Sequence, residues 1–379
     1  MSFDIAILEG QLPKEIWEKM KRSTLSSPAI IAAGEYEQLF RLSGTPFFRE
    51  YTDHSFTHSL DVFKTACELF DQETLPALSP EDINILFLSC VVHDSGLHVT
   101  EDILVSLLDQ SHSVVACPDF DDKPWPELWA EFVAEAKRFN EKQLIAIFGD
   151  SEQPRDLPRS VLDFTQRDRL LAGEFLRRNH TRYAHEMALG RIKSSEGDAF
   201  NQLGGFDNTH RDIVGLIARS HGVGLRSMYD YIDHRYHLRD FNRIHIVFLM
   251  IALRIADYMQ IQPGRAPALF RHLHKIRSPY SAGEWRVHHA VENITTSSLD
   301  PEAIFVAANP LRIGDYLKLE RWMQGLQDEL DKSWAVLGEV YGRFTQEKLN
   351  LLGLKIRRVR SNIEDKKAYK SALRMFLNE

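Results

Sequence analysis

Apolar residues recur at helical spacing along most of the chain. Spacings of three and four residues between apolar positions are typical of amphipathic helices. They predict helices over residues 56–71, 81–94, 101–109, 126–139, 167–180, 209–221, 241–261 and 315–346. Alternation of apolar and polar residues, which indicates strands, occurs only late, in residues 284–296 and 302–309. The pattern therefore predicts a mostly α-helical protein with a small α+β region near its C-terminal end.

The predicted elements fall into a large region and a smaller one. We expect residues 1–279 to form a helical domain and residues 280–379 to form an α+β extension that packs on it. Between about residues 110 and 165, turn-rich segments such as CPDFDDKPWPE flank one helix. Because connections of this length are uncommon inside a compact domain, we interpret this region as an insertion over the core.

Composition narrows the class of protein and its compartment. Of the 379 residues, 44 % are hydrophobic and 26 % are charged, and the formal net charge is −8. This acidic balance argues against broad affinity for nucleic acid or for a membrane surface. The longest apolar run, IVFLMIAL, is too short to span a bilayer. Three cysteines without framework spacing and the lack of a signal-peptide pattern favour the cytoplasm.

Ionisable residues lie in line with the apolar faces of five predicted helices. His58 starts a face that continues through Val62 and Ala66, and His93 and Asp94 end a helix that is apolar nearly all round. Three further helices each place one such residue on an apolar stripe. The complete set is His58, His93, Asp94, His180, His221 and Asp257.

One shared metal site explains why all six residues point inward better than six unrelated core side chains would. Taken singly, each residue is more simply a core side chain that is hydrogen-bonded to backbone groups. Buried carboxylates without partners are costly, however, and neutral imidazoles with carboxylates are common ligands of divalent cations. We therefore expect one or two divalent metal ions. Mn, Fe, Zn, Ni and Mg all suit the ligand types, and the sequence does not choose among them.

The order of these residues resembles that of the HD superfamily of metal-dependent phosphohydrolases. HSLDV is similar to the first-helix motif of that superfamily, VVHDSG to its signature dyad, and LRIAD to its last ligand. The resemblance covers roughly residues 45–265. The chain is most similar to the HD-CE branch, to which the tail LGLKIRRVRSN also points. That branch occurs in bacterial conflict systems, including antiviral defence, and is often fused to GHKL-type ATPase modules, although no ATPase motif is visible here.

The resemblance implies a ligand set and a reaction. His58, His93, Asp94 and Asp257 would hold one metal ion, and Asp94 would bridge to a second ion held by His180 and His221. The implied activity is hydrolysis of a phosphomono- or phosphodiester of a nucleotide or related molecule by a metal-activated water, with Asp94 as a catalytic residue.

Cationic and histidine side chains near these ligands are candidates for further roles. We expect Arg178, Arg182 and Arg254 to bind substrate phosphate, although each is equally well explained as a surface charge or an ion-pair partner. His54, four residues before His58, is the expected general acid, and His98 and His185 compete for that role.

Two other functions stay open on the sequence alone. An HD-type nuclease acting on single-stranded nucleic acid would need a basic groove, which the net charge disfavours. The basic run KIRRVRSNIEDKK at 355–367 fits a solvated helix face or an interdomain contact better than a nucleic-acid patch. A non-catalytic ligand-sensing or interaction module is the alternative from a different class. The expected partners are the phosphoester substrate and a fused or associated GHKL-type ATPase, with no membrane, and a homo-oligomer is compatible with the sequence.

Overall fold

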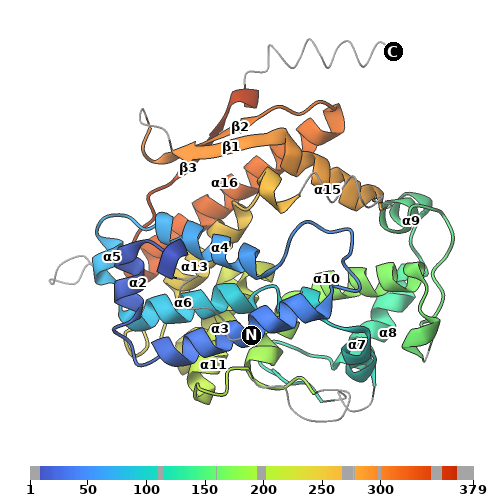
Figure 1. Cartoon of the computed structure of the whole chain (residues 1–379), viewed down its shortest axis with the longest axis horizontal. Coiled ribbons are helices and arrows are strands. Elements are labelled where there is room, and N and C mark those ends of the chain that lie inside the picture. Colours follow the sequence, from blue (N-terminus) through green and yellow to red (C-terminus); the bar gives the residue numbers. More distant parts are fainter. Residues whose placement is uncertain are drawn as a thin grey trace.

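Helices dominate the structure, a computed structural model, and a small sheet lies along one side of the helical body (Figure 1). The structure describes residues 9–109, 114–158, 160–193, 202–266, 276, 278–296, 300–342 and 352–364. The predicted fold class, mostly α with a small C-terminal α+β part, is confirmed. The predicted domain boundaries stay a prediction.

One helix forms the centre of the helical body. Helix α6 (Pro80–Val92) starts at a capping box between Ser79 and Asp82, with Pro80 in the first turn. Because it is apolar on nearly all sides, it is covered on all sides. It contacts α2 (Lys14–Met20), α3 (Ser26–Ser43), α4 (Phe56–Glu68), α11 (Asn208–Arg219) and α13 (Ile246–Tyr258). In Figure 1 it lies in the middle of this group.

Helix α10 (Gln166–Ala188) is longer than predicted and packs against α11. The predicted end at residue 180 is wrong, because Tyr183, Ala184 and Met187 continue its buried face beyond His180. His180 therefore lies in the second half of a helix rather than at its end. The 3₁₀ turn that follows α6, η1 (Ser95–His98), packs against the same helix.

The region predicted as an insertion contains two helices, where the sequence predicted one. Helix α8 (Trp125–Ala136) contacts α7 (Glu101–Leu108), and α9 (Glu141–Phe148) contacts α10 and α15 (Pro279–Ala290). Residues 110–113 and 159 of this region lie outside the described residues. The remaining helices of the body are α5 (Thr74–Ala77) and α12 (Tyr229–Arg235).

The C-terminal part is a three-stranded sheet beside two helices. Strand β1 (Val291–Thr296) pairs antiparallel with β2 (Ala303–Ala308), and β2 pairs parallel with β3 (Arg358–Ser361). Helix α15 and the 29-residue α16 (Ile313–Tyr341) pack against each other, and α16 contacts β3. A small apolar cluster, which includes Val287, Val306 and Leu319, lies between these elements.

Two secondary-structure predictions in this part need correction. Residues 284–290 are helical, because Ser278 caps α15 through the Ser281 N–H and Pro279 occupies the first helical position. For the basic run at 355–367, the prediction of a helix face is wrong for residues 358–361, which form strand β3, and the alternative of an interdomain contact stays a prediction. Residues 365–367 lie outside the described part.

The segment before β3 attaches this sheet to the helical body. The Thr74 hydroxyl donates to the Gly353 carbonyl and accepts from the Gly353 N–H, at 3.0 and 2.8 Å. The Lys355 N–H donates to the Leu69 carbonyl at 2.8 Å, just beyond the end of α4. Within the described ranges no single helix is long and apolar enough to cross a membrane. One bent pair, Pro80–His98 with Glu101–Leu108, meets the length and composition criteria only when both helices are taken together, at an angle of 83°.

Candidate metal centre

Six side chains from five helices converge on one point of the helical body. They are His58 of α4, His93 and Asp94 at the end of α6, His180 of α10, His221 just after α11, and Asp257 of α13. Their ligand atoms form two groups, one of His58, His93 and Asp257 and one of Asp94, His180 and His221, each within 4.8 Å. The structure therefore brings together all six residues that the sequence picked out.

Asp94 lies between two pairs of histidines. Its Oδ2 atom is 3.4 Å from His58 Nε2 and 3.2 Å from His93 Nε2. Its Oδ1 atom is 3.7 Å from His180 Nε2 and 3.8 Å from His221 Nε2. One carboxylate thus presents each of its oxygens to a different pair, which is the arrangement of a bridging ligand.

Backbone carbonyls fix the orientation of three of the four imidazoles. The Nδ1–H groups of His93, His180 and His221 donate to the carbonyls of Cys90, Arg177 and Ala218, each three residues earlier, at 2.7, 2.8 and 2.6 Å. With the proton on Nδ1, the lone pair of each ring is on Nε2 and faces Asp94. This is the usual way in which a protein sets the tautomer of a metal-binding histidine.

The atoms that face inward lack ordinary partners, which supports a bound cation. His58 Nε2 and His93 Nε2 are buried and make no hydrogen bond with the described residues. His180 Nε2 and His221 Nε2 are 2.8 Å apart although both Nδ1 protons are already used, so two lone pairs face each other. Buried nitrogen lone pairs beside two carboxylates are the donor set of a divalent transition-metal ion, and the residues fit such an ion.

Without a cation, the carboxylates and histidines compensate one another. Burial raises the pKa of Asp94, but His93 and the contact with His58 outweigh it, so that pKa lies well below its ordinary value. Burial lowers the pKa of His93, but Asp94 and Asp257 raise it to about 10, so without a cation its Nε2 holds a proton that a bound metal ion would displace. Burial and the neighbouring His180 lower the pKa of His221 to about 3. His221 is thus neutral at pH 7 and its Nε2 is ready to bind a metal ion.

A glycine lets α10 approach the end of α6. A Cβ atom on Gly96 would lie 2.6 Å from both the Cα and the carbonyl oxygen of His180. No side chain fits at that distance from backbone. The glycine of VVHDSG therefore allows the helix that contains His180 to contact the turn after His93 and Asp94.

The three arginines expected to bind phosphate are held by carboxylates. Arg178 pairs with Glu135 and Glu174, and Arg254 pairs with Glu329. Arg254 also donates to the carbonyls of Ser220 and Val223 and so holds the turn that contains His221. No contact described here tests a role in substrate binding, which stays a prediction for both residues.

Arg182 belongs to a buried ion-pair network that links Asp121, in the region predicted as an insertion, to α10 and α11. Arg219 donates to both oxygens of Asp121, at 2.9 and 2.6 Å. The side chains of Asp121, Arg182 and Arg219 are all buried. Arg182 Nε donates to Glu186 at 2.7 Å and lies 3.5 Å from Asp121 Oδ2. Arg182 follows His180 by two residues and Arg219 precedes His221 by two.

The three histidines considered as general acids have different surroundings. The ring centroid of His54 is 5.6 Å from that of His58, whereas both ring nitrogens of His98 are hydrogen-bonded, to Ser43 and to the His54 carbonyl. His185 Nε2 contacts Asp212 at 2.8 Å. Burial, followed by Arg265, holds the pKa of His54 well below its ordinary value, so a neutral ring lies next to the metal ligands. A neutral imidazole with so low a pKa is a poor proton donor, and the general-acid role of His54 stays a prediction.

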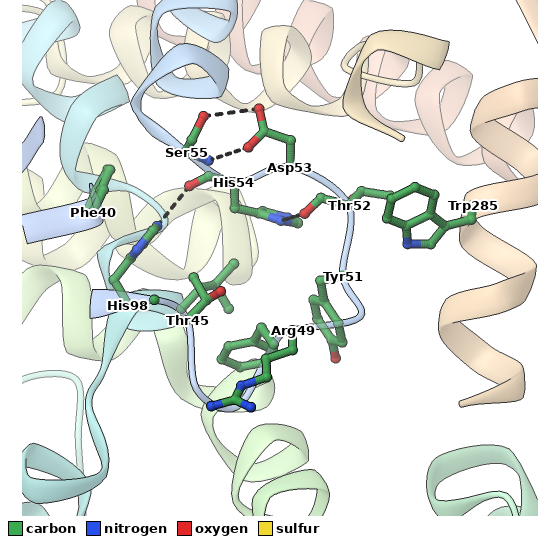
Figure 2. A pocket seen from close by; sticks show the side chains of 13 residues that line it. Phe40, Thr45, Arg49, Tyr51, Thr52, Asp53, His54, Ser55, His98 and Trp285 are labelled. Carbon is green, nitrogen blue, oxygen red and sulfur yellow. Dashed lines mark hydrogen bonds between the residues drawn. The ribbon is translucent and has the colours of Figure 1, made fainter. Parts of the chain in front are cut away.

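Two cavities lie beside His54, whose ring neighbours that of His58, and their walls include residues that sequence reasoning missed. The larger, of about 330 Å³, has aromatic walls that include Phe40, Phe48 and Trp285 (Figure 2). The smaller, of about 230 Å³, includes Arg265, which follows Asp257 by eight residues. Both are lined by Tyr51, Thr52, His54 and Trp285. Trp285 and Arg265 occur outside any motif, so no local pattern indicates that they lie beside His54.

Comparison with known proteins agrees with this geometry. No curated protein and no solved structure matches the chain. The HD-CE family model matches residues 48–332, about three quarters of the chain, and that range includes all six converging residues. Its agreement with the resemblance seen in the motifs confirms the suspected branch. The chain belongs to the HD-CE family.

Proposed function

We propose that this protein is a metal-dependent phosphohydrolase that cleaves a phosphoester of a nucleotide or a related molecule. The observation that supports the proposal most strongly is the position of Asp94, whose two oxygens face two separate pairs of inward-pointing Nε2 atoms. An isolated structural histidine cluster has no need of four lone pairs directed at one carboxylate.

The proposed site has two halves that share Asp94. His58, His93 and Asp257 would hold one ion, and His180 and His221 would hold the other. Divalent cations in such a pair supply an activated water and positive charge for the phosphoryl oxygens. The chain fixes the ligands through the three backbone carbonyls behind the imidazoles. The Asp257 side chain, 26 % exposed, is the most accessible of the six, so substrate would enter on its side.

Metal content and phosphate release, measured on the same samples, test the proposal. The wild type should bind two divalent ions per chain and release phosphate from p-nitrophenyl phosphate or from one of a panel of nucleotides. His58→Ala and His180→Ala should each reduce the metal content toward one ion, and Asp94→Ala should abolish phosphate release, because it removes the group common to both halves.

A matched control separates these effects from general disturbance. His210→Gln changes a histidine on α11 that pairs with Asp207, and it should leave both readouts unchanged. Circular dichroism would verify that all variants keep their helices. Near-normal turnover in Asp94→Ala, or a metal-free wild type, would overturn the proposal.

A further inference from the structure

The smaller cavity beside the metal centre has an unusual charge arrangement. It lies between residues 50–54, Arg177 of α10, the first turns of α15, and Arg265. Its volume of about 230 Å³ is enough for a phosphate group and part of what is attached to it. Four basic side chains line it, namely His54, Arg177, Arg265 and His288, together with Glu50 and Glu284.

Arg265 is the cation in this cavity without a carboxylate partner. Its guanidinium donates to the Asp53 carbonyl through Nε and Nη2, at 2.9 and 2.7 Å, and to the Gln260 carbonyl at 3.3 Å. Across the described ranges, no carboxylate lies within 4.0 Å of it. Burial lowers the pKa of Arg265, and the carboxylates of Asp257 and Asp94 oppose this shift from beyond ion-pair distance. A cation in this position is costly unless an anion comes to it.

The other charged side chains around the cavity have hydrogen-bond or ion-pair partners. Glu174 accepts two hydrogen bonds from Arg177, and Glu284 pairs with Lys318 at 2.7 Å. The Glu50 carboxylate accepts from the Ser278 N–H at 2.8 Å. Of the two arginines that line the cavity, Arg177 is thus paired with a carboxylate, and Arg265 is the one without an ion-pair partner among the described residues.

The cavity is connected to the proposed catalytic centre through two of its walls. His54 precedes the metal ligand His58 by one helical turn, and their ring centroids are 5.6 Å apart. The Arg177 carbonyl accepts from His180 Nδ1. The cavity therefore shares wall residues with the immediate surroundings of the metal ligands. The adjoining aromatic cavity, seen in Figure 2 with Phe40, Tyr51 and Trp285 on its walls, offers room for a flat organic group.

We propose that the Arg265 cavity is an anion subsite that holds a second phosphate of the substrate. The substrate would then be a nucleotide with more than one phosphate, with one phosphate at the metal centre, one on Arg265, and the nucleoside directed to the aromatic cavity. This inference rests on the proposed function for its catalytic part, but anion binding by the cavity does not depend on catalysis.

Phosphate binding to metal-free protein tests the subsite directly. In protein treated with a chelator, isothermal titration calorimetry with inorganic phosphate should detect one site per chain. Arg265→Gln should weaken that binding about tenfold or more, because it removes a charge-assisted hydrogen-bond donor. Arg226→Gln, which removes an exposed arginine that pairs with Glu339, is the matched control and should bind phosphate as the wild type does.

A second variant keeps the test decisive if Arg265→Gln fails to fold, since Arg265 also holds the Asp53 carbonyl. Ser281 lines the cavity and is the third residue of α15, a position at which an acidic residue is favoured by helix capping. Ser281 is buried, so Ser281→Asp should place a carboxylate in the cavity and abolish phosphate binding, and circular dichroism would verify that the variant keeps its helices. Unchanged binding in Ser281→Asp, or no phosphate binding by the metal-free wild type, would overturn the subsite.

Kinetics then separate the subsite from the proposed function. With metal restored, Ser281→Asp should raise the KM for ATP about tenfold or more while the KM for p-nitrophenyl phosphate, which has one phosphate, stays the same. Equal effects on both substrates would contradict the subsite. Absence of phosphate release from every substrate, with phosphate binding intact, would refute the proposed function and leave the subsite standing.

Discussion

The buried pair between Asp121 and Arg219 gives the sharpest stability prediction. Asp121→Asn keeps the shape of the side chain but removes its charge, which leaves Arg219 with no paired anion. The two side chains are only 6 % and 7 % exposed, so water cannot replace the lost carboxylate.

The size of the effect follows from the surroundings. Removing one partner of a buried, hydrogen-bonded ion pair costs about 3–5 kcal/mol. Arg182, whose Nε is 3.5 Å from Asp121, adds a second positive charge and pushes the cost upward. The Phe120 ring, 4.9 Å from the Arg219 guanidinium, contacts it in both proteins and does not change this difference. We expect a net loss of roughly 3–5 kcal/mol in the free energy of unfolding.

Urea denaturation followed by circular dichroism measures this loss. Glu339→Gln breaks the exposed pair with Arg226 and serves as the control, with an expected loss of about 1 kcal/mol or less. The double variant Asp121→Leu with Arg219→Met, which removes both charges, should recover most of the stability. Metal content should fall in Asp121→Asn, because Arg219 and Arg182 flank His221 and His180. A loss below about 1 kcal/mol in Asp121→Asn would refute the reasoning.

Two further predictions concern Gly96 and His288. Gly96→Ala places a methyl group against the backbone of His180, so we expect the free energy of unfolding to fall by about 1–3 kcal/mol and the metal content to be lower. Gly338→Ala, in the exposed last turn of α16 with nothing within 4 Å, should instead be neutral or stabilising in the same urea titration, and equal effects would contradict the steric argument. Burial and Arg265 lower the pKa of His288 to about 4. As the pH falls from about 6.5 to 4, His288 therefore gains a proton in the unfolded chain before it does so in the folded one, which favours unfolding. Over that range the free energy of unfolding of the wild type should fall by up to about 3 kcal/mol more than that of His288→Gln. Parallel stability–pH profiles for the two proteins would show that His288 is not the group responsible.

The metal centre was accessible to sequence reasoning because each ligand lies in line with an apolar stripe. His58, His93 and Asp257 follow the faces of helices that are buried against one another, so the helical period alone turns them inward. His180 was found in the same way, although its helix continues for eight residues beyond it. The buried face of a helix determines which side chains point toward the core, wherever the helix ends.

The partners of the arginines could not be predicted in this way. Asp121 lies about one hundred residues before Arg219, and nothing in either local segment indicates that they pair. The position of Arg265 likewise depends on residues 50–54, because its guanidinium donates to the Asp53 carbonyl 212 positions earlier in the sequence. Local patterns determine which way a side chain points but not which distant side chain it meets.

Residues 284–290 show how a local pattern can mislead. Ser281, Gly283, Trp285 and Val287 are all buried at alternate positions, as in a strand, yet they form a helix. Because α15 is enclosed on more than one side, burial there does not follow the helical period. The capping serine at 278 and the proline at 279 were the better signals.

The attachment of residues 352–355 to the end of α4 has a consequence for the order of folding. Thr74 and Gly353 are 279 positions apart, so their contact closes a loop that contains every metal ligand except His58. Closing so long a loop is entropically unfavourable until the elements on both sides are in place. During synthesis the ligands, which end at Asp257, leave the ribosome well before Gly353 does. We therefore expect the centre to assemble before residues 352–355 attach to the end of α4 and to Thr74.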